Sequence, residues 1–368
     1  MTTVSDNITN TTECLNHTQA QLYTVEYTAF NEILIRILIP SITAFGIAAN
    51  SAFLFVIYRL QDMRTTTNIY LANLAVADSL VLLSGCAQYL GKYLASPVVD
   101  YHYATLFKHR AGCELPYLVF YAAVFASLFF ITLVAYERYI AVCKPVLHRR
   151  IKSPARTCRL SLMAWLIPLI FVTIHAGAFR HTSICLDWDV TTGKYDRFPR
   201  IIRKCKWEDW VAVSICTFEL GQFVIAFIAN GTMYAKIIQT LNKRSYKQGS
   251  RTAGAAANHI SRMILIIAVV CFSCSLPKQI LNVGIISKRI EKSTADDYGI
   301  SNDGVRLLFW VGVFAGFFNS AINPVIYNVT NRDYRMAFRR AFKCPSKAHR
   351  PLTPNCSSKI TRFSADRK

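Results

Sequence analysis

The chain has 368 residues, of which 53% are hydrophobic and only 17% are charged. Soluble domains usually carry about a quarter charged residues, so this composition excludes an ordinary soluble domain and indicates a membrane protein. The net charge is +21. Most of the basic residues lie beside apolar segments, which indicates attraction to anionic lipid, and no nucleic-acid-binding module is apparent.

Seven apolar runs divide the chain. Each reaches or exceeds the roughly 20 residues that a helix needs to cross about 30 Å of hydrocarbon. A β-barrel would require alternating polar and apolar residues, which the runs lack. The sequence therefore predicts an all-α membrane protein, a seven-transmembrane helix bundle. The runs are Leu38–Tyr58, Ile69–Gly91, Leu115–Tyr136, Leu160–Phe179, Val211–Ala235, Met263–Ser287 and Leu307–Asn331.

The loops and tails give the expected orientation. Lys and Arg crowd the segments after the third and fifth runs and the C-terminal tail, so the positive-inside rule makes these segments cytoplasmic. The tail 1–31 carries three glycosylation sequons, at Asn7, Asn10 and Asn16, on the outer side. Since no cleavable signal peptide is apparent, we expect the first run to act as a signal anchor in a multi-pass plasma-membrane protein.

Four cysteines lie in the predicted outer segments, where disulfides persist, and they allow three pairings. We favour Cys113–Cys205, which ties the top of the third helix to the loop that enters the fifth. Cys14–Cys185 could then pin the N-terminal tail. The main alternative is Cys185–Cys205, because Thr191–Lys194 is typical of a hairpin turn midway between them.

The segment after the transmembrane domain 32–330 is amphipathic. Tyr334, Ala337, Phe338, Ala341 and Phe342 have helical spacing among five basic residues, which predicts a helix lying on the lipid bilayer over 331–343. Cys344, just beyond it, is typical of a palmitoylation site. The cytoplasmic tail 344–368 contains Ser and Thr that are either phosphate acceptors for arrestin recruitment or an unmodified linker.

Polar groups inside a membrane are costly unless they are paired. Asp78 interrupts the second run, while Asn319 and Asn323 share one face of the seventh. With Ser127 of the third run, these residues predict a small site for a sodium ion. The alternative is a hydrogen-bonded network that only holds the helices together. Ligand affinity indifferent to sodium in both wild type and Asp78→Ala would contradict the ion site.

Polar residues also occupy the outer halves of the runs, where inward-facing side chains would form a wet pocket of mixed charge. One or two of them have a simpler explanation, because long side chains snorkel to the membrane surface. The outer loop Arg180–Trp210 contains both charge signs and aromatic residues, which suits a peptide better than a lipid. The candidate pocket residues are Lys92, Glu219, Gln222, Lys278, Gln279 and Asn282.

The third run leads directly into Glu137-Arg138-Tyr139. Charges that flank membrane helices are mostly Lys and Arg reaching into headgroups. An adjacent acid and arginine instead indicate a charge that exchanges between an intrahelical partner and a molecule arriving from the aqueous side.

Taken together, these residues resemble the rhodopsin-like (class A) G-protein-coupled receptors. The resemblance covers the whole bundle, from about Asn31 to Cys344. The matching positions are Asn50 of the first helix, Leu74–Asp78 of the LAxAD motif, Cys113 of the family disulfide, Glu137–Tyr139 as the ERY form of the DRY motif, Trp165 of the fourth helix, Tyr234 of the fifth and Asn323–Tyr327 of the NPxxY motif.

The resemblance implies that a ligand binds among the third, fifth, sixth and seventh helices and the loop Arg180–Trp210. The sixth helix would pivot near Pro277 and swing outward at its cytoplasmic end, which admits a heterotrimeric G protein. Arg138 would leave Glu137 during this motion. The residues assigned to activation and coupling are Glu137, Arg138, Tyr139, Tyr234, Asn323, Pro324, Tyr327 and Val146.

The subfamily is narrowed by residues that differ from those of other members. Amine receptors carry an Asp where this chain has Phe120, so the resemblance adds Phe120 to the candidate pocket residues, and the opsin lysine is missing from Leu307–Asn331. The glycosylated tail, the charged outer loop and the ERY triplet are most similar to neuropeptide receptors, so we expect an extracellular peptide ligand. A lipid or other small molecule is the alternative. A transporter or an enzyme is disfavoured, because no repeats, catalytic constellation or metal motif is apparent.

The chain also departs from the family pattern. Ser275 replaces the sixth-helix tryptophan, the fifth-helix proline is missing near Ala226, and Ala257 stands where some members place an acid facing the arginine. We therefore expect Arg138 to be restrained by Glu137 alone, and the receptor to have appreciable basal activity.

Overall fold

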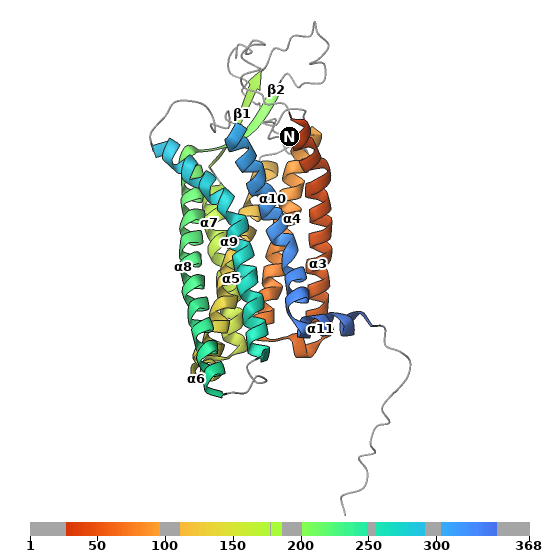
Figure 1. Cartoon of the computed structure of the whole chain (residues 1–368). Coiled ribbons are helices and arrows are strands. Elements are labelled where there is room, and N and C mark those ends of the chain that lie inside the picture. The colour runs from red at the N-terminus through yellow and green to blue at the C-terminus, as the bar shows by residue number, and fades with distance from the viewer. Residues whose placement is uncertain are drawn as a thin grey trace, which may run out of the picture.

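The computed structural model describes residues 27–95, 111–176, 178–185, 201–248, 255–290 and 303–343. Within these residues, seven helical spans are long and apolar enough to cross a membrane. They run side by side as a bundle (Figure 1), which confirms the predicted architecture. The helices that build the spans are α2 (Ala29–Ile33), η1 (Leu34–Leu38) and α3 (Ile39–Arg59) for the first, then α4 (Thr66–Ala95), α5 (Ala111–Cys143), α7 (Pro154–Ala176), α8 (Asp209–Gln248), α9 (Ala255–Ile290) and α10 (Asp303–Thr330).

The first span begins well before the predicted apolar run. The Thr28 side chain caps α2 by accepting a hydrogen bond from the Asn31 backbone, and a π-helical stretch, η1, continues into α3. The charged residues Glu32 and Arg36 set the N-terminal limit of the predicted apolar run. In the structure both side chains contact Tyr93 of α4. The Tyr93 hydroxyl donates to Glu32 at 3.3 Å, and the Arg36 guanidinium lies 5.8 Å from the ring centroid.

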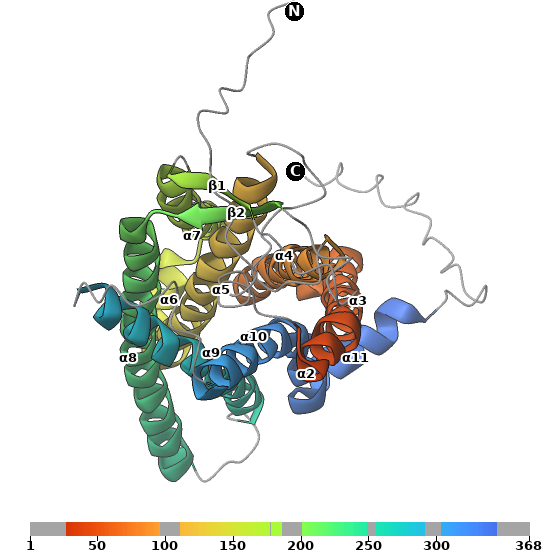
Figure 2. The same ribbon diagram turned by 90° about the horizontal axis from the view of Figure 1, so that it is seen from above.

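Seen from above, α3, α4, α5, α7, α8, α9 and α10 surround the interior of the bundle (Figure 2). The first helix approaches its neighbours closely at Gly46. A Cβ atom there would lie 2.5 Å from Leu82 of α4 and 2.9 Å from the Ala321 side chain of α10. One turn further, the Asn50 amide donates to the carbonyls of Gly46 and Ser320, at 3.0 Å each. Glycine therefore permits an approach that Asn50 then stabilises.

A two-stranded antiparallel hairpin covers the end of the bundle away from α11, and it adds strands that the all-α prediction did not include (Figure 1). Strands β1 (Phe179–Cys185) and β2 (Ile201–Trp207) pair with Cys185 opposite Ile201 and His181 opposite Cys205. Cys185 and Cys205 are thus displaced by four residues, or about 13 Å along the strands, whereas a disulfide needs Cα atoms within about 7 Å.

The alternative Cys185–Cys205 pairing is therefore wrong, although Cys185 is disulfide-bonded. The favoured Cys113–Cys205 pairing stays a prediction. Cys14 lies outside the described residues, as do the sequons Asn7, Asn10 and Asn16, Cys344 and the tail 344–368.

Short helices lie at the opposite end of the bundle. They are η2 (Gln61–Met63) between α3 and α4, α6 (Pro145–Ile151) after α5, and α11 (Arg332–Phe342) after α10. The Asn331 side chain caps α11 by accepting from the Asp333 backbone at 2.8 Å. Helix α11 turns away from α10 and lies across the end of the bundle, as expected of the amphipathic segment (Figure 1).

Three side-chain contacts fix α11 to the first two spans. The Tyr334 hydroxyl donates to Asn68, and burial raises the pKa of Tyr334 to about 12. Arg59 donates to the Ala341 carbonyl at 2.5 Å. Arg340 donates to Asp62 at 2.6 Å and thereby holds the pKa of that exposed carboxyl below its usual range.

Candidate functional site

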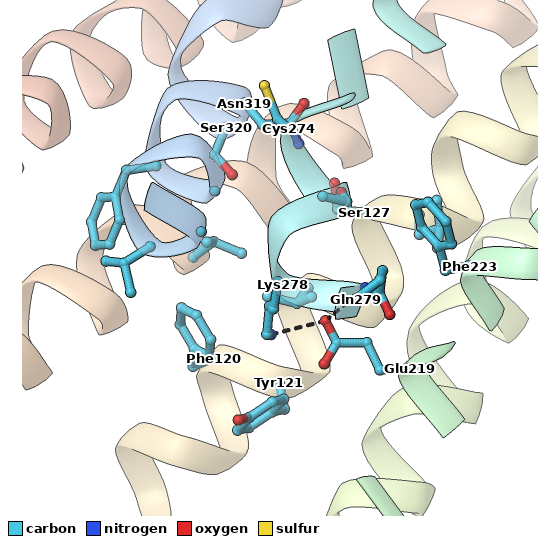
Figure 3. A pocket seen from close by; sticks show the side chains of 18 of the residues that line it. Phe120, Tyr121, Ser127, Glu219, Phe223, Cys274, Lys278, Gln279, Asn319 and Ser320 are labelled. Atoms are coloured by element: carbon cyan, nitrogen blue, oxygen red, sulfur yellow. Dashed lines mark hydrogen bonds and ion pairs between the residues drawn. The ribbon is translucent and has the colours of Figure 1, made fainter. Parts of the chain in front are cut away.

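A cavity of about 200 Å³ lies between α4, α5, α8, α9 and α10. Aromatic rings and small side chains form most of its wall (Figure 3). Of the predicted pocket residues, Phe120, Glu219, Gln222, Lys278 and Gln279 line this cavity. The sequence had therefore identified inward-facing polar residues on two different helices, α8 and α9.

An ion pair occupies the middle of the cavity. Lys278 of α9 and Glu219 of α8 point toward each other (Figure 3), with 2.9 Å between the Lys278 Nζ and the Glu219 Oε1. Gln279 donates to the same oxygen at 3.4 Å. The Lys278 ammonium also lies 5.8 Å from the ring centroid of Phe120 and 5.1 Å from that of Tyr121. The lysine is thus held by a carboxylate and two aromatic faces.

Two predicted pocket residues do not line the cavity. Lys92 donates to the Tyr117 hydroxyl at 3.1 Å, near the outer ends of α4 and α5. Asn282 is buried and donates to Gln279 at 3.2 Å, so it supports a lining residue from behind. The prediction missed Tyr121, because an aromatic residue inside an apolar run carries no polar signal.

The deep end of the cavity borders the predicted sodium site. Asp78 is fully buried and accepts hydrogen bonds from Ser127 at 3.2 Å and from Asn323 at 2.8 Å. The structure thus brings three of the four predicted residues together. No hydrogen bond between Asn319 and Asp78 is found within the described part of the chain, although Asn319 lines the same cavity.

The end of α5 that leads into α6 differs from the prediction. Glu137 is only 2% exposed and is paired with His148 of α6 at 2.9 Å and with Arg156 of α7 at 3.5 Å. Among the described residues, no salt bridge joins Glu137 to Arg138. The predicted direct pairing of Arg138 with Glu137 is not formed, because the Glu137 carboxylate is held by His148 and Arg156 instead. His148 and Arg156 had no signal in the sequence, since only the turn through α6 brings them near.

Among the described residues, Arg138 lacks a hydrogen-bond partner at one of its nitrogen atoms. Its Nε atom is buried and makes no hydrogen bond within the described ranges. Nearby in the fold, the Tyr234 hydroxyl donates to the Ile264 carbonyl of α9 at 3.2 Å. The Tyr327 hydroxyl is buried without a hydrogen-bond partner there, while its ring packs on Phe53 with centroids 4.8 Å apart.

The other predicted coupling residues lie at the same end. Tyr139 has the ammonium groups of Lys144 and Lys236 each 5.9 Å from its ring centroid. Val146 on α6 is 81% exposed. Pro324 lies inside α10, directly after Asn323 of the Asp78 network.

This architecture is that of a seven-helix membrane receptor, and the comparisons with known proteins agree. Residues 49–327 match the 7 transmembrane receptor (rhodopsin family). The chain therefore belongs to this family and is a multi-pass membrane protein and a G-protein-coupled receptor.

The relatives include receptors named for peptides. Somatostatin receptor type 2 of Mus musculus is 25% identical over 301 residues, which cover 80% of this chain and 73% of the relative. Neuropeptides B/W receptor type 2 of Homo sapiens is 25% identical over 324 residues, which cover 86% and 87%. Somatostatin receptor type 4 of Rattus norvegicus is 26% identical over 299 residues, which cover 80% and 69%.

Proposed function

We propose that this receptor binds a peptide at its extracellular side and transmits the binding to a heterotrimeric G protein. The observation that carries the proposal is the Lys278–Glu219 ion pair, which lies among aromatic rings in the middle of the cavity. A lipid tail would cover this ion pair and offer neither charge a new polar partner, which is unfavourable. A peptide brings both polar groups and aromatic or aliphatic side chains. The names of the somatostatin and neuropeptides B/W receptors support the same ligand class.

The ligand must bind the active arrangement more tightly than the inactive one, since equal affinity shifts no population. Lys278 directly follows Pro277, the proline inside α9, so a ligand at Lys278 acts where that helix bends most readily. Movement of α9 would change the Tyr234–Ile264 contact at the cytoplasmic end. Arg138, whose Nε makes no hydrogen bond among the described residues, and the exposed Val146 would then receive the G-protein α-subunit.

The localisation follows from charge and glycosylation signals. The receptor is proposed to lie in the plasma membrane, with Asn7, Asn10 and Asn16 outside and the basic loops inside. Treatment of intact cells with a protease should then remove a glycosylated N-terminal tag, whereas a C-terminal tag should survive. Arrestin is proposed to bind after phosphorylation of the tail 344–368, and Cys344 is the proposed palmitoylation site.

The residues around Asp78 fit a sodium ion, which would neutralise the buried carboxylate. The Oδ1 atoms of Asn319 and Asn323 are buried without hydrogen-bond donors, and oxygen atoms of this kind suit a hard cation. Asp78, Ser127, Asn319 and Asn323 would hold the ion. We expect sodium chloride to raise the unfolding temperature of the purified receptor above that in choline chloride. The difference should vanish in Asp78→Asn, and a difference that persists there would contradict the site.

The proposed function is tested with a ligand screen on cells that express the full chain, with calcium and cyclic-nucleotide readouts. We expect peptide fractions to produce a signal that is lost in Arg138→Ala at equal surface expression. A response confined to lipid fractions would contradict the peptide assignment and favour the lipid alternative.

A further inference from the structure

Two side chains of α8 that line the cavity each have an acceptor oxygen without a hydrogen-bond donor among the described residues. The ion pair with Lys278 and the hydrogen bond from Gln279 both involve the Oε1 atom of Glu219, and no hydrogen bond within the described residues reaches its Oε2. Gln222 uses its amide nitrogen to donate to the Phe125 carbonyl at 2.9 Å, which leaves its Oε1 buried without a donor. Glu219 and Gln222 are three residues apart, so they lie on the same face of α8.

The exposure of the two charged partners is unequal. The Glu219 side chain is 8% exposed, whereas the Lys278 side chain is 32% exposed. A ligand anion that captured Lys278 would leave the carboxylate buried with only the Gln279 amide. A ligand cation that captured Glu219 would leave the ammonium partly solvated against Phe120 and Tyr121. An uncompensated buried charge costs more free energy than a partly solvated one. Displacement of Lys278 from Glu219 by a ligand cation therefore costs less than displacement of Glu219 from Lys278 by a ligand anion.

From these acceptors and this asymmetry we infer that the cavity receives a cationic group with several N–H donors, a guanidinium or an ammonium. The group binds Glu219 and Gln222 and displaces Lys278 from the carboxylate. A volume of about 200 Å³ accommodates the end of one basic side chain rather than a whole peptide. The inference rests on the proposed function in one respect: the cationic group is part of a peptide, either an Arg or Lys side chain or the N-terminal amine.

The direct test measures binding of small probes to the purified full-length receptor through its unfolding temperature. The probes are n-propylguanidinium, n-propylammonium and propionate, compared at constant ionic strength. We expect the guanidinium or the ammonium to raise the unfolding temperature and propionate to leave it unchanged. The stronger of the two cations distinguishes an Arg-like ligand from a Lys-like one or an N-terminal amine. Stabilisation by propionate, or by no probe, would overturn the inference.

Two cavity variants and one control sharpen the result. Glu219→Gln should weaken binding of the cationic probe by about tenfold or more, since a hydrogen bond to a charged group is lost. Lys278→Met removes the competing ammonium and should strengthen binding of the same probe, which also covers the case that Glu219→Gln does not fold. Glu32→Gln makes the same chemical change outside the cavity and should leave probe binding unchanged. Equal binding in Lys278→Met and wild type would count against the displacement.

A second measurement separates this inference from the proposed function. Synthetic peptides that differ only in Arg, Lys, Gln or Glu at one position are tested for signalling. If peptides signal equally well without a basic residue and Glu219→Gln keeps their potency, the peptide function stands and the cationic site is wrong. If the cationic probes bind as expected but every peptide is silent, the site stands and the peptide function fails.

Discussion

Glu137 depends on two side chains from other helices, an imidazole on α6 and a guanidinium on α7. The carboxylate is 2% exposed, so water cannot replace these partners. If both were removed, the nearest cation along the chain would be the guanidinium of Arg138. The contacts with His148 and Arg156 thus hold the carboxylate of Glu137 away from Arg138, the arginine that we propose contacts the G protein.

We therefore expect His148→Ala/Arg156→Ala to lower ligand-independent nucleotide exchange on the G protein. The freed carboxylate should turn to Arg138, and a decrease of about fivefold corresponds to about 1 kcal/mol of restored restraint. The measurement is guanine-nucleotide exchange in membranes at equal receptor density. Arg149→Ala/Arg150→Ala, two exposed residues of the same helix, is the control and should keep its activity. Unchanged exchange in the first variant would argue against this role of Glu137.

The residues of the cavity show what a sequence reveals and what it hides. Glu219, Gln222, Lys278 and Gln279 could be predicted, because polar side chains inside membrane-length runs need a reason to be there. Their pairing could not, since it depends on how α8 and α9 are rotated about their axes. Lys92 has the same polar signal, yet it bonds to Tyr117 instead of lining the cavity.

At the scale of elements, the packing of α3 against α4 and α10 depends on Gly46. Gly46→Val should lower the free energy of unfolding by about 1–3 kcal/mol, because Leu82 and the backbone of Ala321 leave no room for a side chain. Gly231→Val makes the same change where a Cβ meets no atom within 4 Å, so it should have little effect. Thermal unfolding of the two purified variants tests this, and equal losses would contradict the close approach.

The attachment of α11 rests on a buried contact more than on its exposed ion pair. Tyr334→Phe leaves the buried Asn68 carboxamide oxygen without this donor and should cost about 1–3 kcal/mol of stability. Thermal unfolding of the purified variant measures this loss.

The control for Tyr334→Phe is Asp62→Asn, which breaks the exposed pair with Arg340 and should change stability much less. Because the pKa of Asp62 is lowered in the fold, its contribution is present above the usual carboxyl range and is lost as the pH falls through the lowered value. The difference between wild type and Asp62→Asn should therefore be constant near neutral pH and shrink in acid. A larger loss in Asp62→Asn than in Tyr334→Phe would reverse the assignment.

For the whole molecule, the seven runs predicted the seven spans, because apolar length is a strong signal in a membrane. The ends of the spans were harder to predict. The first helix extends to Ala29 because Glu32 and Arg36 find a partner in Tyr93, and the fourth ends where β1 begins. Contacts between distant segments, such as Glu137 with His148, cannot be obtained from a single sequence, since they depend on the path of the inner loop.

We propose that Arg138, which forms no salt bridge with Glu137 among the described residues, is available to the G protein. The most direct test is ligand-independent guanine-nucleotide exchange in membranes that contain the wild-type receptor, Arg138→Ala at equal density, or no receptor. We expect exchange above the receptor-free level for the wild type and a return to that level for Arg138→Ala. Exchange by the wild type that equals the receptor-free level would contradict it.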